Sequence, residues 1–438
     1  MARRDPEDAP VASAPRNLRR TARMRLTRRG WVTLALGIVI TALAYPLGRQ
    51  ELLVVGVAGI LLPLVGRLIA RLRRPRFEVL RVFSPPVVSA GGAVHVGVRI
   101  RNAGASTSTQ LVWNDAIPWP ADAAPHPLAP IPATTTAARV VTADYELRPP
   151  RRGVYAIGPL VVENHDPFGM AASVAALGVQ DRLVVIPAVG VLSTGGPVLA
   201  DGEGAAQLVQ RRATGNDDDL TTREYRPGDA LRRVHWRASA RHGELMVRQE
   251  EHRSHPDARL VIDTRLGGYP DAHPDAGETW DASHASEAFE WVIRMTASLG
   301  MHLEANGFQV SIEETAAPQI DQLGEIWEGG RRAEAFLTSL AAVRLLDRPA
   351  AELAQAAPDT AGPLFAMMAD PEDATLDWML RRRRGADLAV AFTVGARDEA
   401  LERLADAGWT VVPVTSAAAP GDAWRAISAV TEVIHGAD

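Results

Sequence analysis

Two long apolar runs lie near the start of the chain, and only a short polar break separates them. The first covers residues 31–48 (WVTLALGIVITALAYPLG), and the second covers residues 52–66 (LLVVGVAGILLPLVG) and continues beyond Arg67. A membrane span takes about 20 apolar residues, with about 17 as the lower limit, so both runs are long enough. The pattern predicts a two-helix transmembrane hairpin over residues 31–70, with a buried helix pair of a soluble core as the alternative.

Arginines flank this hairpin on both sides. Residues 1–30 carry nine arginines and three acids, and residues 67–76 carry five arginines and no acid. Positive flanks stay in the cytoplasm, so we expect residues 1–30 to form a basic cytoplasmic tail and everything after residue 76 to be cytoplasmic. A secretory signal peptide is disfavoured, because the first run ends without an A-x-A site and a second run follows at once. The predicted location is the cell membrane, as a multi-pass protein.

Residues 76–188 show short runs of alternating apolar and polar positions, broken by Gly, Pro, Asn and Ser. In the run AVHVGVRIRN, for example, Val94, Val96, Val98 and Ile100 alternate with polar or small residues. A period of two residues is that of a half-buried strand. Roughly six or seven such strands in about 110 residues predict an immunoglobulin-like β-sandwich domain.

The pattern changes twice after residue 188. Residues 189–215 form a glycine-rich connector, and residues 216–258 hold a dense cluster of arginines around one tryptophan. In residues 259–438, short buried strands such as RLVIDT alternate with amphipathic stretches such as SEAFEWVIRMTASLGMHLEANG. Regular alternation of this kind predicts an α/β domain whose parallel sheet is covered by helices on both faces.

The arginine cluster, residues 224–251, reads EYRPGDALRRVHWRASARHGELMVRQEE. A Pro-Gly turn leads to Asp229, which is placed to cap a helix. That helix would set Arg233, Arg237 and Arg241 four residues apart on one face. A row of like charge needs nearby acids or an outside anion as its partner. An internal salt-bridge lock and a surface for another protein both stay open; nucleic-acid binding is disfavoured because no second basic aromatic strip appears.

Composition excludes several kinds of chemistry. The chain has 438 residues, a net charge of −5 and no cysteine, and its 47 Lys and Arg residues are all arginine. Without cysteine there is no thiolate nucleophile, and without lysine there is neither a G-x-x-x-x-G-K-[ST] phosphate loop nor a kinase lysine. No G-x-S-x-G elbow is present, so Ser239 near His235 is a weak hydrolase signal. The spacing of His242, His252 and His255 suits no single helix face, which disfavours a metal site there.

Four ordered motifs carry a family resemblance. They are R-R-G-V-Y-x-x-G-P-L at residues 151–160, D-P-F-G at 166–169, T-G at 214–215, and R-E-Y-R-P-G-D-x-x-R-x-V-H-W-x-x-S-A-R at 223–241. Through them the chain, over roughly residues 25 to 310, resembles the bacterial domain-of-unknown-function 58 family. The resemblance implies an N-terminal membrane hairpin, a β-rich domain and a C-terminal von Willebrand factor A-like α/β domain.

The resemblance also implies partners. Members of the family often accompany a MoxR-type AAA+ ATPase and transglutaminase-like membrane proteins, which implies an accessory role in the assembly or maturation of other proteins. No catalytic activity is established for the family.

A metal site is not expected, although the von Willebrand A fold binds a divalent cation through D-x-S-x-S. The corresponding residues run from Asp263 to Gly267, where both serines are missing and Arg265 brings a positive charge to the metal position. We therefore expect no intact cation site and no cofactor. Asp263 is expected to pair with Arg265 or with an arginine of the motif.

The leading hypothesis is a non-enzymatic, membrane-anchored adaptor that binds a MoxR-type AAA+ ATPase and other membrane proteins of the same system. The residues expected to form the contact, or alternatively an internal lock, are Arg226, Asp229, Arg232, Trp236, Arg237 and Arg241. The rival hypothesis is a hydrolase or metal-dependent enzyme in which His235, His242 and Asp263 converge on an open cleft.

Overall fold

The protein folds into two compact units. The computed structural model describes residues 23–72, 76–119, 125–133, 140–193, 222–224, 239–241, 243–248, 257–272, 286–320, 331–347 and 362–435. The β-rich unit comprises residues 1–188, 273–285 and 330–343, and the α/β unit comprises residues 189–272, 286–329 and 344–438. The chain therefore leaves the α/β unit at residues 330–343, a segment that the sequence analysis placed in the C-terminal domain, and then returns to it.

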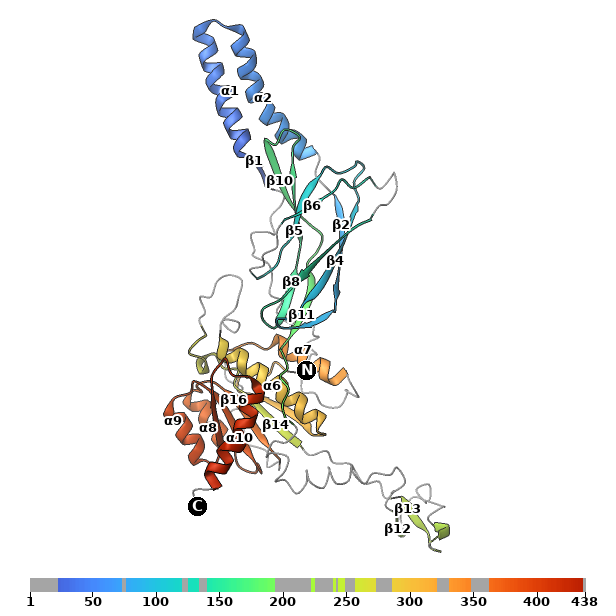
Figure 1. Cartoon of the computed structure of the whole chain (residues 1–438), viewed down its shortest axis with the longest axis vertical. Coiled ribbons are helices and arrows are strands. Elements are labelled where there is room, and N and C mark those ends of the chain that lie inside the picture. The colour runs from blue at the N-terminus through green and yellow to red at the C-terminus, as the bar shows by residue number, and fades with distance from the viewer. Residues whose placement is uncertain are drawn as a thin grey trace. The chain divides into compact units, whose positions relative to one another are not determined.

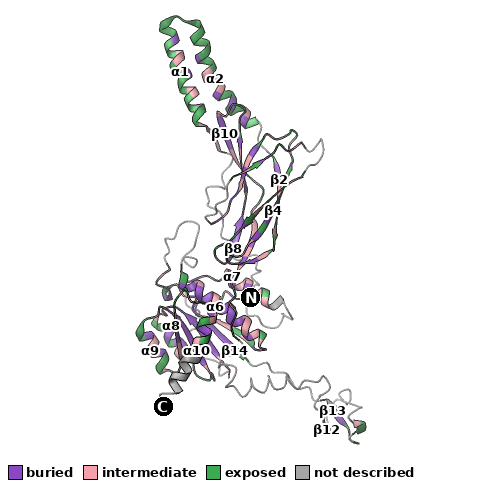
Figure 2. Ribbon diagram, in the orientation of Figure 1, coloured by how far each residue is buried: buried purple, intermediate pink, exposed green. Residues whose placement is uncertain are grey.

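Two antiparallel helices, α1 (Arg28–Leu47) and α2 (Gln50–Leu72), form the N-terminal hairpin (Figure 1). Thr27 begins α1 as its N-cap, because its Oγ1 accepts a hydrogen bond from the Gly30 amide at 3.1 Å. Gly48 ends α1 with a left-handed φ of 60°. Both helices are long and apolar enough to cross a membrane by length and composition, and most of their large apolar side chains are exposed (Figure 2).

Small residues line the contact between α1 and α2. A Cβ atom on Gly37 would lie 2.8 Å from the carbonyl carbon of Gly59, and one on Gly56 would lie 2.7 Å from the Thr41 amide nitrogen. Real carbon atoms do not approach so closely, so larger side chains would push the helices apart. Close backbone approach over small residues is typical of helices that pack in lipid.

A short strand precedes the hairpin, within the stretch that was expected to be a basic tail. β1 (Arg23–Leu26) pairs antiparallel with β10 (Ala171–Leu177). Four residues are too few to show a period of two, which is why no pattern predicted this strand. The hairpin therefore follows directly from a strand of the β-rich unit.

The D-P-F-G motif forms a turn that receives the start of the hairpin. Asp166 accepts hydrogen bonds from two amides of its own turn, that of Phe168 at 3.0 Å and that of Ala171 at 2.5 Å. Thr27 Oγ1 donates a hydrogen bond to the Gly169 carbonyl at 2.7 Å. The buried carboxylate thus shapes the turn, and the turn holds the residue that caps α1.

The same turn touches both helices. A Cβ atom on Gly30 would lie 2.2 Å from the Met170 carbonyl oxygen, and one on Gly66 would lie 2.8 Å from Asp166 Oδ2. Only glycine fits at these two places, one on each helix. The motif is therefore a joint between the hairpin and the β-rich unit.

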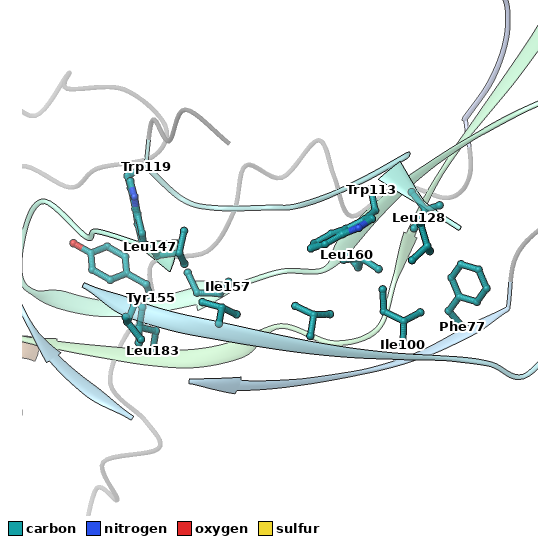
Figure 3. Packing of buried hydrophobic residues seen from close by; sticks show 14 of the residues in the cluster. Phe77, Ile100, Trp113, Trp119, Leu128, Leu147, Tyr155, Ile157, Leu160 and Leu183 are labelled. Atoms are coloured by element: carbon teal, nitrogen blue, oxygen red, sulfur yellow. The ribbon is translucent and has the colours of Figure 1, made fainter. Parts of the chain in front are cut away.

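The strands of the β-rich unit form three sheets. They are β2 (Phe77–Ser84), β3 (Val87–Ser89), β4 (Val94–Asn102), β5 (Leu111–Asp115), β6 (His126–Leu128), β7 (Val140–Leu147), β8 (Gly153–Ile157), β9 (Leu160–His165), β10 and β11 (Asp181–Ile186). The sheet orders are β1-β10-β9-β5-β6, β2-β4-β7 and β3-β11-β8. All three contribute to one apolar core (Figure 3). The alternation predicted for β4 is confirmed, since Val94, Val96, Val98 and Ile100 are all buried.

A buried ion pair crosses this core. The guanidinium of Arg81 on β2 binds both oxygens of Asp115, with Nε–Oδ2 at 2.9 Å and Nη2–Oδ1 at 2.6 Å. Asp181 accepts from Arg81 Nη1 at 2.9 Å, and Tyr145 donates its hydroxyl to Asp115 at 2.5 Å. A Cβ atom on Gly158, the second glycine of R-R-G-V-Y-x-x-G-P-L, would lie 2.7 Å from the guanidinium carbon, so this motif glycine makes room for Arg81.

Helix α7 (Arg331–Ala342) contacts β8 and β11 of the β-rich unit. The buried Arg152 of the R-R-G-V-Y motif donates a hydrogen bond to the carbonyl of Val343, immediately after the helix, at 3.2 Å. A cation at a helix C-terminus is favourably placed against the helix dipole. The R-R-G-V-Y motif thus serves as the docking point of α7.

The α/β unit holds a five-stranded parallel sheet in the order β15-β14-β16-β17-β18. Its strands are β14 (Asp257–Ile262), β15 (Gln309–Glu314), β16 (Leu364–Met368), β17 (Ala389–Val394) and β18 (Thr410–Val414), and its helices are α6 (Glu287–Ala305), α8 (Asp373–Arg382), α9 (Asp398–Asp406) and α10 (Pro420–His435). Helices α8 and α9 pack on the face of Val261 and Ala366. Ring contacts of Trp291 on α6 with Phe392, and of Trp424 on α10 with Phe365, place α6 and α10 on the other face. The predicted parallel sheet with helices on both faces is confirmed.

Candidate functional site at the carboxyl edge of the parallel sheet

The strand order of the parallel sheet reverses beside β14. β15 follows β14 in sequence and pairs on one side of it, whereas β16 pairs on the other side. The loops that leave two such strands diverge, and ligands of open α/β sheets bind in the crevice that forms there. Asp263 follows β14 directly, and Asp370 lies just after β16.

Asp263 is fully buried, and its two carboxylate oxygens differ. Oδ1 accepts hydrogen bonds from Thr315 Oγ1 at 2.5 Å and from the Arg265 amide at 3.2 Å. Oδ2 is buried and accepts no hydrogen bond within the described part of the chain. A Cβ atom on Gly268 would lie 2.4 Å from Oδ2, so this glycine leaves the space into which Oδ2 points.

The surroundings of Asp263 favour its protonated form. Burial raises the pKa of Asp263 to about 6, although the hydrogen bonds from Thr315 and the Arg265 amide act in the opposite direction. Two nearby charges act in opposite directions. The Arg265 guanidinium lowers the pKa of Asp263, and the Glu372 carboxylate raises it. A carboxyl group that exchanges its proton near pH 6 is chemically suited to proton transfer.

Arg265 pairs with Asp263 only through its backbone. Its guanidinium forms an ion pair with Glu372, with Nη2–Oε2 at 2.5 Å, and lies 3.5 Å from Thr375 Oγ1. The expected pairing of the Arg265 side chain with Asp263 is therefore wrong, whereas the alternative pairing of Asp263 with an arginine of the motif stays a prediction. The reason is geometric, because the turn after β14 directs the Arg265 amide to Asp263, while Glu372 at the start of α8 receives the side chain.

A second ion pair lies on the neighbouring strand ends. Asp370 Oδ1 accepts hydrogen bonds from the amide of Arg397 at 3.1 Å and from its Nε at 2.9 Å. The hydrogen bond to Asp370 raises the pKa of Arg397. The Asp370 amide donates to the Gly268 carbonyl at 2.9 Å, which ties the loop after β14 to the loop after β16.

This edge of the sheet is thus enclosed by ion pairs. Among the described residues, no group of three or more His, Asp or Glu side chains could hold a metal ion. Thr315, Asp370, Glu372 and Arg397 were not singled out from the sequence. All four follow strands of the parallel sheet, so the rule that loops at carboxyl ends meet at one edge would have found them.

The arginine cluster of residues 224–251, or arginine-tryptophan motif, lies largely outside the described residues. This applies to Arg226, Asp229, Arg232, His235, Trp236, Arg237 and His242. Arg241 is described and exposed, in the short helical stretch of residues 239–241. The convergence of His235, His242 and Asp263 stays a prediction.

The ends of the motif are held together. β12 (Thr222–Glu224) pairs antiparallel with β13 (Met246–Arg248), and among the described strands these two form a sheet of their own. Ser239 Oγ accepts a hydrogen bond from the Met246 amide at 2.9 Å. Gly243, with φ at 77°, makes the turn before β13. The hydroxyl of Ser239 is therefore bonded to backbone within the motif.

Comparison with known proteins gives one family and several remote structures. The family described as "Protein of unknown function DUF58" matches residues 221–270. No curated protein matches the chain.

The solved structures are similar only at low identity. The CARDB domain of the PF1109 protein from Pyrococcus furiosus, in complex with di-metal ions, is 12% identical with a TM-score of 0.18, over 26% of this chain and 88% of that chain. The alkylpurine DNA glycosylase AlkC of Pseudomonas fluorescens is 12% identical with a TM-score of 0.18, over 31% and 38%. A family two carbohydrate esterase from Cellvibrio japonicus is 8% identical with a TM-score of 0.16, over 83% and 96%. Scores this low carry no argument about function.

The matched residues 221–270 contain β12, β13, the arginine-tryptophan motif between them, and β14 with Asp263. They include the last of the four ordered motifs on which the resemblance rested. The match over residues 221–270 therefore supports the resemblance of this chain to the DUF58 family.

Proposed function

We propose that the protein is a non-enzymatic, membrane-anchored adaptor that binds partner proteins, foremost a MoxR-type AAA+ ATPase, in the assembly or maturation of other proteins. In this proposal the hairpin crosses the cell membrane twice and both folded units lie in the cytoplasm. The β-rich unit is an immunoglobulin-like sandwich, and the α/β unit is von Willebrand factor A-like. The contact is the arginine-tryptophan motif, with Arg226, Asp229, Arg232, Trp236, Arg237 and Arg241.

The pairing of β12 with β13 carries the proposal. The register sets Glu224 opposite Met246, so the motif between them starts and ends at one place. This ladder joins neither the parallel sheet nor the sheets of the β-rich unit in the described part of the chain. Two short strands that pair with each other and, among the described strands, with no other suit the presentation of the segment between them to another protein.

The anchor is supported by the contacts of the hairpin. The two apolar helices expose most of their large side chains, and large exposed apolar surfaces on a folded protein mark contact with lipid or another protein. The D-P-F-G turn fixes the base of both helices through Gly30 and Gly66. A rigid joint of this kind would hold the β-rich unit at a constant distance from the membrane.

The test is affinity purification of the tagged full chain from detergent-solubilised membranes, followed by mass spectrometry. Arg237→Ala is compared with wild type, and Arg384→Ala, an exposed arginine of the α/β unit, serves as the control. We expect an AAA+ ATPase with wild type and with the control, and its loss from a folded Arg237→Ala protein. If the folded variant keeps the ATPase, the motif is not the contact; if no sample contains an ATPase, the adaptor proposal fails.

A second candidate function rests on Asp263. A buried carboxyl group with a pKa of about 6, one oxygen of which accepts no hydrogen bond from the described residues, lies at the switch point of a parallel sheet and fits a general base of a hydrolase or metal-dependent enzyme. That enzyme would also use His235 and His242. Hydrolysis of a substrate library that is lost in Asp263→Asn and in His235→Ala would favour this candidate over the adaptor.

A further inference from the structure

Four arginines ring the base of the helical hairpin. Arg28 and Arg29 begin α1, and Arg67 and Arg71 lie in the last turns of α2. The D-P-F-G turn fixes the height of these arginines along the hairpin. Gly30 on α1, next to Arg29, contacts the turn. Gly66 on α2, next to Arg67, contacts the same turn. A Cβ atom on Gly169 of this turn would lie 4.0 Å from Arg29 Nη1. The two pairs therefore lie at one height.

These arginines lack counter-ions. All four side chains are exposed, and none forms an ion pair with a described residue. The neighbouring acids are already engaged: Glu163 pairs with Arg25 at 2.8 Å, and the carboxylate of Asp166 accepts the amides of its own turn. The arginine ring, defined as Arg28, Arg29, Arg67 and Arg71, is thus a concentrated positive charge that no described side chain compensates.

Aromatic residues mark the two ends of the apolar surface. Trp31 lies two residues beyond Arg29 and is 61% exposed, and Tyr45 lies near the far end of α1 and is 92% exposed. At 1.5 Å per residue they are about 21 Å apart along the helix. Trp and Tyr prefer the two membrane interfaces, so Trp31 sets the arginine ring at the height of the lipid headgroups.

We infer that the arginine ring is a binding site for the phosphate of anionic phospholipids. Guanidinium groups bind phosphate oxygens by paired, charge-assisted hydrogen bonds, and arginines from two helices can hold one headgroup between them. The positive end of the α1 dipole adds to the same field. The inference rests on the proposed membrane anchor and adds lipid selectivity to it. The joint between the hairpin and the β-rich unit would then also bind the anionic headgroup.

The experiment measures which lipids remain on the purified full chain. The protein is taken up in detergent with equimolar phosphatidylglycerol and phosphatidylcholine, and native mass spectrometry counts the adducts of each. The test variant carries Arg28→Gln, Arg29→Gln, Arg67→Gln and Arg71→Gln. The control variant removes the same charge at four exposed arginines away from the hairpin, with Arg99→Gln, Arg148→Gln, Arg384→Gln and Arg425→Gln.

Wild type and control are expected to retain phosphatidylglycerol over phosphatidylcholine by at least about fivefold. One arginine near an anionic lipid surface strengthens binding by about this factor. The test variant is expected to bind both lipids equally. Two further variants change one helix at a time: Arg28→Gln with Arg29→Gln, and Arg67→Gln with Arg71→Gln. Their lipid preference should lie between that of wild type and that of the fourfold variant. They provide the test if the fourfold variant does not fold.

Four results would overturn the inference. If wild type shows no lipid preference, or if the folded test variant keeps the preference, the ring is not a lipid site. If the test variant keeps the lipid preference but loses a bound acidic protein, the ring is a protein contact. Displacement of the lipid by inorganic phosphate at matched ionic strength assigns the ring to free phosphate. Carbonate extraction of membranes separates the two proposals, because a chain released by carbonate disproves the anchor itself, and the lipid site with it.

Discussion

Asp115 in the β-rich unit and Asp263 in the α/β unit are both buried carboxylates, and their surroundings differ. Asp115 receives two guanidinium bonds from Arg81 and the hydroxyl of Tyr145, so both of its oxygens are paired. Asp263 receives one hydroxyl and one amide on the same oxygen, and its other oxygen has no partner in the described part of the chain. The nearest guanidinium, that of Arg265, binds Glu372 instead.

The contrast distinguishes a charge that stabilises the fold, at Asp115, from a charge that is incompletely paired and available for binding or chemistry, at Asp263. Burial alone lowers the pKa of Arg81, but its bonds to Asp115 and Asp181 outweigh burial and raise it, which keeps the guanidinium charged. At Asp263, burial dominates over weaker partners and the proton is held more tightly. Proteins retain such incompletely compensated groups mainly at sites of binding or chemistry.

The largest effect is expected for Asp115→Ala. Removing the carboxylate leaves the Arg81 guanidinium buried with only Asp181 and the Val179 carbonyl as partners, and breaking a buried pair costs about 3–5 kcal/mol. Thermal unfolding and hydrogen exchange of β2 and β4 would report the loss. Tyr145→Phe removes a single hydrogen bond to Asp115 and should lose about 1 kcal/mol. Equal losses in the two variants would contradict the dominance of the ion pair.

Asp263→Asn should change the pH dependence of stability. Because the pKa of Asp263 is raised from 3.8 to about 6, its contribution to stability is fully present below about pH 4 and is lost as pH rises to about 6. The variant does not titrate, so its stability relative to wild type should increase across that window by about 3 kcal/mol. Urea unfolding at several pH values measures the difference.

Thr315→Val sharpens the same prediction. The Thr315 hydroxyl lowers the pKa of Asp263, so its removal should move the upper end of the window to higher pH. A constant difference between wild type and Asp263→Asn from pH 4 to 7 would contradict the raised pKa.

Gly268→Ala tests the space beside Asp263 Oδ2. The added Cβ would lie 2.4 Å from that oxygen, which sits on a fully buried side chain held by Thr315. We expect a loss of about 1–3 kcal/mol, as for other overpacked interiors. The matched control is Gly395→Ala, because both changes add one methyl group but the site at Gly395 is open; its positive φ of 68° alone should cost about 1 kcal/mol. A smaller loss at Gly268 than at Gly395 would show that the pocket is not closed.

The smallest effect is expected for Arg265→Met. Its ion pair with Glu372 is partly exposed, with 41% of the Glu372 side chain accessible, so the loss should stay below about 1 kcal/mol. Removing this cation should also raise the pKa of Asp263, because Arg265 lowers it. The pH titration described for Asp263→Asn, repeated in the Arg265→Met background, measures that change.

Periodicity predicted the elements that repeat. The buried Val94, Val96, Val98 and Ile100 of β4 and the alternation of strands and helices after residue 256 could be read directly, because each element spans enough residues to show its period. Pairings between distant segments could not be read. β1 has only four residues, and α7 has the same helical pattern whether it covers the parallel sheet or docks on β8 and β11.

The candidate site was predicted only in part. Asp263 was found because it follows a buried strand, but the choice of Glu372 as the partner of Arg265 depends on the path of the loop before α8. The roles of Gly158 and Gly66 were also hidden, since what touches a glycine is set by residues far away in sequence, here Arg81 and Asp166. Tertiary contacts of this kind leave no local pattern.

The central claim is that the protein acts by binding through its arginine-tryptophan motif and not by chemistry at Asp263. The most direct measurement is quantitative affinity purification of wild type, Arg237→Ala and Asp263→Asn full chains from solubilised membranes, with each variant checked for folding. The account predicts that an AAA+ ATPase is retained by Asp263→Asn and lost from Arg237→Ala. Retention by Arg237→Ala together with loss from Asp263→Asn would contradict it and move the function to the carboxyl edge of the sheet.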